Sequence, residues 1–326
     1  MKFLKRASNT ATVALLTLLP LAGAAQAQNA DYPNRIVRVV VPFAPGGSTD
    51  NAGRMVALSF EKQFKQTFVV ENKPGAFTQI GTDAVVKAAP NGYTLLLAAS
   101  NLPTEQVINK DWPFKAERDL TTIGLISGAG LALAVNPASP IKNLRDLIDF
   151  SKANPGKLNQ AMAASPALDI EDLKARLGLN LTAVIYKGGP LAVQAVVSGE
   201  GDITSGSPQD IVSLVRAGRL RALVYSEKER HPLLPDVPTV NEAGVGISDF
   251  DGVLWFGLFG PAGLPADIVT KLHGGVQTML KDPEMVERIR SLGMRPFPLT
   301  LAEARARVAA ETARTEALMA RGVKLR

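Results

Sequence analysis

The sequence has no cysteine among its 326 residues and only two histidines, His231 and His273. The absence of cysteine excludes a disulfide framework, a thiolate zinc site, an iron–sulfur cluster, a cysteine nucleophile and a lipid anchor on cysteine. The histidines lack a local partner for a metal site or a Ser-His-Asp triad, and we expect both to be surface residues. Motifs of the phosphate loop, the dinucleotide fold, the nucleophile elbow and the zinc proteases are missing as well.

Long apolar runs are also scarce, and the one near the start is short. Residues 11–22 are apolar, follow three basic residues and precede an A-x-A sequence at residues 25–27. A membrane-spanning helix needs about 20 apolar residues, and Pro20 interrupts this stretch. We therefore predict a secretory signal peptide over residues 1–27, cleaved after Ala27, and a periplasmic location.

The charge balance disfavours a nucleic-acid partner. Without residues 1–27 the chain keeps 33 basic residues against 30 acidic ones, and no basic block with interleaved aromatics remains. The remaining length suggests two domains of about 150 residues each. A chain of this size buries enough surface to fold without disulfides, which suits a soluble periplasmic protein.

Short apolar runs alternate with helical patterns along the chain. Apolar residues recur every four positions from Ala52 to Phe64, which places them on one face of a helix between two apolar runs. Strand, helix and strand at this spacing indicate a parallel α/β sheet. The predicted strands span residues 36–41, 68–70, 94–98, 131–135, 158–162, 182–186, 221–225 and 253–259.

Two helix starts carry side chains that can cap them. Ser207 precedes Pro208, and Asp210 follows near the positive end of the helix dipole, so we expect the Ser207 hydroxyl to cap this helix. Thr300 and Glu303 form the pattern of a capping box at the start of the last helix.

Residues 42–50, with the sequence PFAPGGSTD, form the most informative loop. They follow a predicted strand and open a predicted helix. Gly46 and Gly47 let backbone N–H groups approach a ligand, and Ser48 or Thr49 is expected to cap the helix. The free N–H groups at its start favour an anion. A plain strand-to-helix turn is the alternative interpretation.

Three further loops have the same small or polar character. They are residues 73–78, Ser100-Asn101 and residues 186–190, each after a predicted strand. Open α/β sheets bind ligands at the carboxyl ends of their strands. Each loop alone is also consistent with a purely structural role. Their recurrence in both halves of the chain favours a cleft between two domains.

A family resemblance combines these loops with other segments in a fixed order. The segments are Tyr32-Pro33 and residues 40–54, 69–76, 80–98, 186–190, 217–226, 234–244 and 255–265. Together they resemble the Bug family, the TctC-like periplasmic solute receptors of tripartite tricarboxylate transporters. The resemblance covers essentially the whole mature chain.

The resemblance implies a two-lobed periplasmic-binding-protein fold of type II-like architecture, with a hinge, a ligand cleft between the lobes and no cofactor. It places residues 31–128 and 252–326 in the first lobe and residues 129–251 in the second. It also implies a protein that is not an enzyme but captures a small carboxylate and passes it to membrane permease subunits. We expect a monomer.

The resemblance also implies which residues hold the ligand. In the first lobe they are Phe43, Ala44, Gly46, Gly47, Thr49 and Asp50 in the glycine loop, together with Ser100 and Asn101. In the second lobe they are Ala164, Ser165, Lys187 and Gly188.

The chain departs from the family pattern at two places. Phe77 stands in a turn where the family usually has GAGG, and it is expected to line the cleft and change ligand size. Pro166 stands in a loop that is usually small and glycine-rich, and it removes a backbone donor.

Two other functions remain open from the sequence. The protein could act as a ligand-dependent co-sensor for a membrane sensor kinase instead of feeding a permease. A periplasmic enzyme would need a general base, and Asp50 could serve in a dry cleft. In a binding protein, Asp50 would instead orient the loop or meet an amino or hydroxyl group of the ligand.

Overall fold

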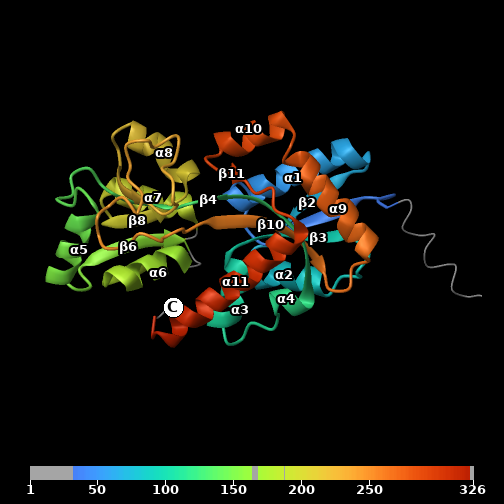
Figure 1. The fold of residues 1–326 in the computed structure, drawn as a ribbon, viewed down its shortest axis with the longest axis horizontal. Helices are drawn as coiled ribbons and strands as arrows, with labels where there is room; N and C mark the ends of the chain where they lie inside the picture. The colour runs from blue at the N-terminus through green and yellow to red at the C-terminus, as the bar shows by residue number, and fades with distance from the viewer. Residues whose placement is uncertain (1–31, 164–167, 187, 324–326) are drawn as a thin grey trace, which may run out of the picture. The chain divides into compact units, whose positions relative to one another are not determined.

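The computed structural model describes residues 32–163, 168–186 and 188–323. The strands form two separate sheets (Figure 1). The first sheet contains β1 (Val37–Val41), β2 (Phe68–Asn72), β3 (Thr94–Ala99), β4 (Leu120–Ala129), β10 (Leu254–Pro261) and β11 (Arg295–Pro296). The second sheet contains β5 (Ala132–Val135), β6 (Leu158–Ala163), β7 (Leu181–Tyr186), β8 (Ile203–Gly206) and β9 (Arg221–Tyr225).

The helices divide between the two sheets, and we call each sheet with its helices a lobe. Those of the first lobe are α1 (Ser48–Phe64), α2 (Gln79–Val86), α3 (Asn101–Ile108), α4 (Ala116–Asp119), α9 (Ala266–Met279), α10 (Pro283–Ser291) and α11 (Leu301–Ala320), with the 3₁₀ helix η1 (Ala76–Thr78). Those of the second lobe are α5 (Leu144–Ala153), α6 (Leu168–Leu177), α7 (Gly189–Ser198) and α8 (Pro208–Arg216). The two-lobed α/β fold is thus confirmed, while the predicted lobe boundaries stay a prediction.

The first sheet is mixed rather than parallel. Strands β1, β2 and β3 are parallel, as the strand–helix–strand spacing predicts, but β10 runs antiparallel between β3 and β4. The sequence did not predict β4, because glycines interrupt its apolar run. A Cβ on Gly124 would lie 3.3 Å from His273 of α9, and a Cβ on Gly128 would lie 2.7 Å from Phe297. At Gly128 the Leu254 carbonyl oxygen would also lie 2.8 Å from a Cβ, so a larger residue would require a shift of the backbone, whereas at Gly124 a small shift of the neighbours would suffice.

Helices cover both faces of the first sheet. The face that carries Val40 and Leu96 packs against α2, α3 and α11. The opposite face meets α1, where a Cβ on Gly53 would touch Val41 and Leu97. The parallel strands β1 and β3 in this sheet carry one polar residue each, Arg38 and Thr94, which is usual for parallel strands covered on both faces.

The second sheet is also covered on both faces. Leu133 and Val135 of β5 belong to a core with α5 and α6, whereas Ala132 and Ala134 of β5 belong to a core with α7 and α8. This alternation follows from the two-residue period of a strand. The chain therefore builds two separate hydrophobic cores around its second sheet.

Two chain segments cross between the sheets, and hydrogen bonds join one segment to the other. The first passes through Gly130, and the second includes Ser226, Glu227 and Gly252. Glu227 Oε1 accepts the Gly130 N–H at 2.6 Å, and the Ser226 hydroxyl donates to the Gly252 carbonyl at 2.6 Å. A Cβ on Gly130 would lie 2.7 Å from Glu227, so no larger residue fits there without a shift. The crossings thus form one hydrogen-bonded hinge.

A buried ionic cluster joins α6 of the second lobe to α11 of the first. Arg314 donates to Asp169 and, at 2.9 Å, to Asp172. Glu311 lies next to them and is 4% exposed. Burial raises the pKa of Glu311 to about 7, and the Asp169 carboxylate adds to this rise, while Arg314 and Arg307 oppose it. Arg314 pairs with Asp169 and Asp172, and Arg176 also pairs with Asp172, so the excess carboxyl group is that of Glu311, which has no ion pair among the described residues.

We expect this excess to make stability depend on pH. The folded protein keeps a proton on Glu311 that the unfolded chain releases near 4.5, so stability is lost as pH rises from about 4.5 to about 7. Glu311→Gln should remove this loss and raise the free energy of unfolding above that of wild type at a pH of about 8. Urea denaturation across this range, with the exposed Glu316→Gln on the same helix as control, measures the effect. If the free energies of unfolding of wild type and Glu311→Gln changed with pH in parallel, this role of Glu311 would be contradicted.

Candidate ligand-binding site

The glycine loop places backbone N–H groups at the start of α1. Gly46 has φ = +89°, a left-handed conformation that favours glycine. Gly47 is extended and is the N-cap, and no side chain caps the helix. The prediction that Ser48 or Thr49 caps α1 is therefore wrong. The first N–H groups of a helix have no intrahelical acceptor, so those of α1 are potential donors to a bound anion.

Asp50 holds this loop in place from inside. Its side chain is 2% exposed, and its Oδ2 accepts the Gly46 N–H and Arg54 Nε, both at 2.9 Å. Its Oδ1 accepts Asn72 Nδ2 at 2.9 Å, and the same amide donates to the Phe43 carbonyl at 3.0 Å. Burial alone would raise the pKa of Asp50, but these hydrogen bonds outweigh it and hold the pKa below its ordinary value.

These contacts assign a structural role to Asp50. Both carboxylate oxygens already accept hydrogen bonds, so Asp50 is an ionised support for the loop rather than a free general base. Sequence reasoning missed Asn72 and Arg54, which complete this support. Asn72 belongs to the 69–76 segment of the family resemblance, but nothing in that segment indicates that Asn72 faces the glycine loop.

The ends of β2 and β3 bring the other predicted residues of the first lobe together. Asn101 Nδ2 donates to the Thr78 hydroxyl at 3.4 Å, which links the start of α3 to the turn after β2. In that turn Ala76, Phe77 and Thr78 have φ of 45°, 53° and 79°. Three left-handed non-glycine residues in succession are strained, and such strain clusters at functional sites. Phe77 is 45% exposed.

The second lobe presents Gly188 as the N-cap of α7, again without a side-chain cap. The predicted residues Ala164, Ser165 and Lys187, and also Pro166, lie outside the described residues. Ser207 is the N-cap of α8, as predicted, but its hydroxyl donates to Asp210 Oδ2 at 2.8 Å instead of accepting a backbone N–H. The capping box of Thr300 and Glu303 is present.

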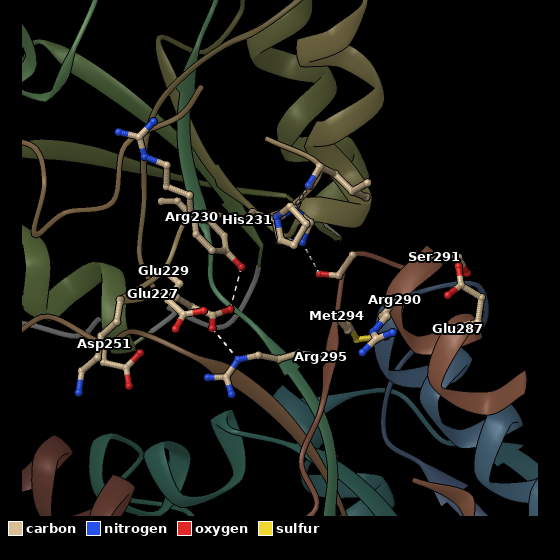
Figure 2. A pocket seen from close by; sticks show the side chains of 15 residues that line it. Glu227, Glu229, Arg230, His231, Asp251, Glu287, Arg290, Ser291, Met294 and Arg295 are labelled. Atoms are coloured by element: carbon tan, nitrogen blue, oxygen red, sulfur yellow. Dashed lines mark hydrogen bonds and ion pairs between the residues drawn. The ribbon is translucent and has the colours of Figure 1, made fainter. Parts of the chain in front are cut away.

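A cavity of about 520 Å³ lies beside the hinge, between the loop after β9 and the α10–β11 turn. Figure 2 shows its walls, with Glu227 ion-paired to Arg295 at 2.6 Å. His231 lies in the wall, and its prediction as a surface residue is wrong because it is 8% exposed. Its Nδ1 accepts the Leu233 N–H, so Nε2 carries the proton and donates to the Gly293 carbonyl at 3.1 Å. Burial lowers the pKa of His231, which keeps the ring neutral near pH 7.

The described parts of the chain hold no other obvious chemistry. Over residues 32–163, 168–186 and 188–323, no three His, Cys, Asp or Glu side chains are placed to hold a metal ion. Within the same ranges, no helix has both the length and the apolar character needed to cross a bilayer. What the geometry offers is donor-rich loops at strand ends, an arrangement suited to binding an anion.

Comparison with known proteins identifies the family. Residues 52–323 match the model of the tripartite tricarboxylate transporter family receptor. The chain is 34% identical to the "UPF0065 protein in gbd 5'region" of Cupriavidus necator over 96% of this chain and 94% of that one. It is 32% identical to Protein BugT of Bordetella pertussis over 90% and 91% of the two chains. The chain belongs to this receptor family, as the resemblance in the sequence predicted.

Solved structures agree with this assignment. The periplasmic binding protein BugD is 31% identical, with a TM-score of 0.78 over 90% of this chain and 99% of that one. Rpa4515 of R. palustris with adipate is 28% identical, with a TM-score of 0.80 over 88% of this chain and 97% of that one. MatC of Rhodopseudomonas palustris with bound malate is 29% identical, with a TM-score of 0.79 over 88% of this chain and 99% of that one. The family and these structures are solute-binding proteins, so the enzyme interpretation of Asp50 is excluded.

The support of the glycine loop can be tested with Asp50→Asn. One side of the new amide would point a donor at existing donors, so we expect a loss of about 1–3 kcal/mol in the free energy of unfolding at neutral pH. Because the folded pKa is below 3.8, this stabilisation is present above that value and is lost as pH falls through the folded pKa. The difference between variant and wild type should therefore shrink in acid.

Urea denaturation at neutral and acidic pH measures this difference. Asp83→Asn is the matched control, because it removes an exposed carboxylate that pairs with Lys87 one turn away. We expect the control to change stability by less than about 0.5 kcal/mol. Equal effects of the two substitutions would show that Asp50 does not support the loop.

Proposed function

We propose that the protein is a periplasmic receptor that captures a small organic acid and delivers it to the permease subunits of a tripartite tricarboxylate-type transporter. The observation that carries this proposal is the glycine loop. Gly46 and Gly47 lead into an uncapped helix start, and Asp50 holds the loop in shape from the buried side. Membership of the receptor family and the acids named with two similar structures, adipate and malate, support the same ligand class.

The ligand lies, in this proposal, between the carboxyl ends of the parallel strands of the two lobes. The first lobe contributes Phe43, Ala44, Gly46, Gly47, Thr49, Asp50, Phe77, Ser100 and Asn101. Asp50 acts through the loop by accepting the Gly46 N–H, whereas the N–H groups from Gly47 into the first turn of α1 meet the carboxylate. The second lobe contributes the start of α7 at Gly188, with Ala164, Ser165 and Lys187 from the family pattern. The lobes span residues 31–128 with 252–326, and residues 129–251.

The free energy that micromolar binding requires favours contacts from both lobes. Micromolar affinity requires about 8 kcal/mol. A carboxylate at one helix start gains about 0.3–1 kcal/mol, so several donors and burial between the lobes must act together. Hinge closure assembles such contacts. The hinge segments at Gly130 and Gly252 are suited to this movement, because their hydrogen bonds keep the crossings together while the lobes rotate.

The proposed function also includes export of the protein to the periplasm. Residues 1–27 act as a signal peptide that is removed after Ala27, and the mature protein works in the periplasm as a monomer. It requires no cofactor. The basic start, short apolar core and A-x-A sequence support this export route.

A substitution at Gly47 tests the site. Gly47 has ordinary extended backbone angles, and a Cβ at this position would lie 4.0 Å from its nearest neighbour, so Gly47→Leu fits the fold without strain. We expect the leucine to block the N–H groups of α1 and to weaken acid binding at least tenfold, about 1.4 kcal/mol. Thermal shift with a panel of small carboxylic acids, on residues 28–326, measures binding through the rise in Tm.

The control is Gly274→Leu, at an exposed position of α9 where a Cβ also meets no neighbour within 4 Å. This variant should keep the Tm shifts of wild type. Undiminished shifts in Gly47→Leu would refute the site. If no acid in the panel raises the Tm of wild type, the proposed ligand class is wrong.

A further inference from the structure

The start of α7 carries a carboxylate of the protein itself. Asp210, in the first turn of α8, packs against Gly189, the first residue of α7. A Cβ built on Gly189 would lie 2.9 Å from Asp210 Oδ2 and 3.6 Å from its Cγ. The absence of a side chain at Gly189 is therefore what lets the carboxylate reach the backbone at the start of the helix.

Other groups fix the direction of this carboxylate. The Ser207 hydroxyl donates to Asp210 Oδ2 at 2.8 Å, and the Asp210 carboxylate also accepts a backbone hydrogen bond from Ser207. Among the described residues, which do not include Lys187, no ion pair joins a cationic side chain to the Asp210 carboxylate. Burial raises the pKa of Asp210, and the hydrogen bonds with Ser207 lower it.

The position has a direct consequence for a ligand. The positive start of a helix attracts an anion, and α7 has no side-chain cap of its own. Asp210 places a carboxylate at this helix start. Two carboxylates at van der Waals separation repel each other, whereas a hydroxyl or ammonium group would donate to Asp210.

We propose that Asp210 is a specificity-determining residue, which makes the protein select acids with one carboxylate and a hydroxyl or ammonium donor at the far end. The ligand carboxylate binds at α1 in the first lobe, and the donor end meets Asp210 in the second lobe. A dicarboxylate of the same length binds more weakly. This inference rests on the proposed function, since it assumes that an acid bridges the two lobes.

Matched ligand series test the proposal. One series is adipate, δ-hydroxyvalerate and δ-aminovalerate, and the other is succinate, β-hydroxypropionate and β-alanine. Within each series the carboxylate and chain are kept while the far end changes from a carboxylate to a hydroxyl or an ammonium group. Isothermal titration calorimetry on residues 28–326 measures Kd for wild type, Asp210→Asn and the control Asp149→Asn. Asp149 is an exposed carboxylate on α5 of the same lobe.

In wild type, we expect the best acid with a donor end to bind at least tenfold more tightly than its dicarboxylate partner. Asn keeps an oxygen to accept the Ser207 hydroxyl but removes the negative charge. Asp210→Asn should therefore improve dicarboxylate binding at least tenfold and weaken binding of the ammonium-ended acid. Asp149→Asn should leave all six values within about twofold, since it lies outside the site.

The outcomes separate this inference from the proposed function. If wild type binds a dicarboxylate as tightly as its donor-ended partners, or if Asp210→Asn leaves the ratio unchanged, the role of Asp210 is refuted while the receptor function stands. If wild type binds other acids of the panel but no member of either series, the role of Asp210 is refuted, and if it binds no acid at all, the ligand class is refuted as well. Thermal denaturation of each variant confirms that a change in Kd does not come from unfolding.

Discussion

The buried carboxylate of Glu227 is the contact on which the arrangement of the two lobes depends. It accepts the N–H of Gly130 on one crossing segment and the hydroxyl of Tyr225 at 2.8 Å, and it pairs with Arg295 of the first lobe. A carboxylate with 8% exposure is costly to bury unless it is fully paired, and Glu227 has three donors. Losing one donor would leave part of this charge without compensation. The hinge is therefore specified by hydrogen bonds rather than by apolar packing alone.

The same use of a buried carboxylate recurs at the glycine loop. Asp50 collects donors from Gly46, Arg54 and Asn72, so its charge is satisfied inside the protein. The N–H groups at the start of α1 are then left to face outward, since no side chain turns back to cap them. A cap by Ser48 or Thr49 would have consumed a donor that a ligand needs. The missing cap is thus consistent with binding rather than with stability.

The sequence predicted the parts of the fold that depend on local pattern. Short apolar runs predict strands β1, β2 and β3. The side chains of Thr300 and Glu303 predict the capping box of α11. Strand β4 was missed because Gly124 and Gly128 break its apolar run, and at Gly128 the close approach of Phe297 and of the Leu254 backbone favours glycine. The burial of His231 was missed for a similar reason. Its partner, Gly293, is 62 residues away, and no local signal indicates such a contact.

In the candidate site, too, the local sequence predicts some residues, and long-range contacts determine the others. Gly46, Gly47 and Asp50 stand together in the sequence, and their loop could be predicted. The role of Asn72 depends on the pairing of β2 with β1, and the role of Asp210 depends on the packing of α8 against Gly189. Both are long-range contacts. The two aspartates differ in one respect that matters for binding: donors of the protein surround Asp50, whereas Asp210 has the Ser207 hydroxyl and its own helix turn. An acid that spans the lobes should therefore turn its carboxylate toward α1, where donors are in excess, and its donor end toward α7, where an acceptor is in excess.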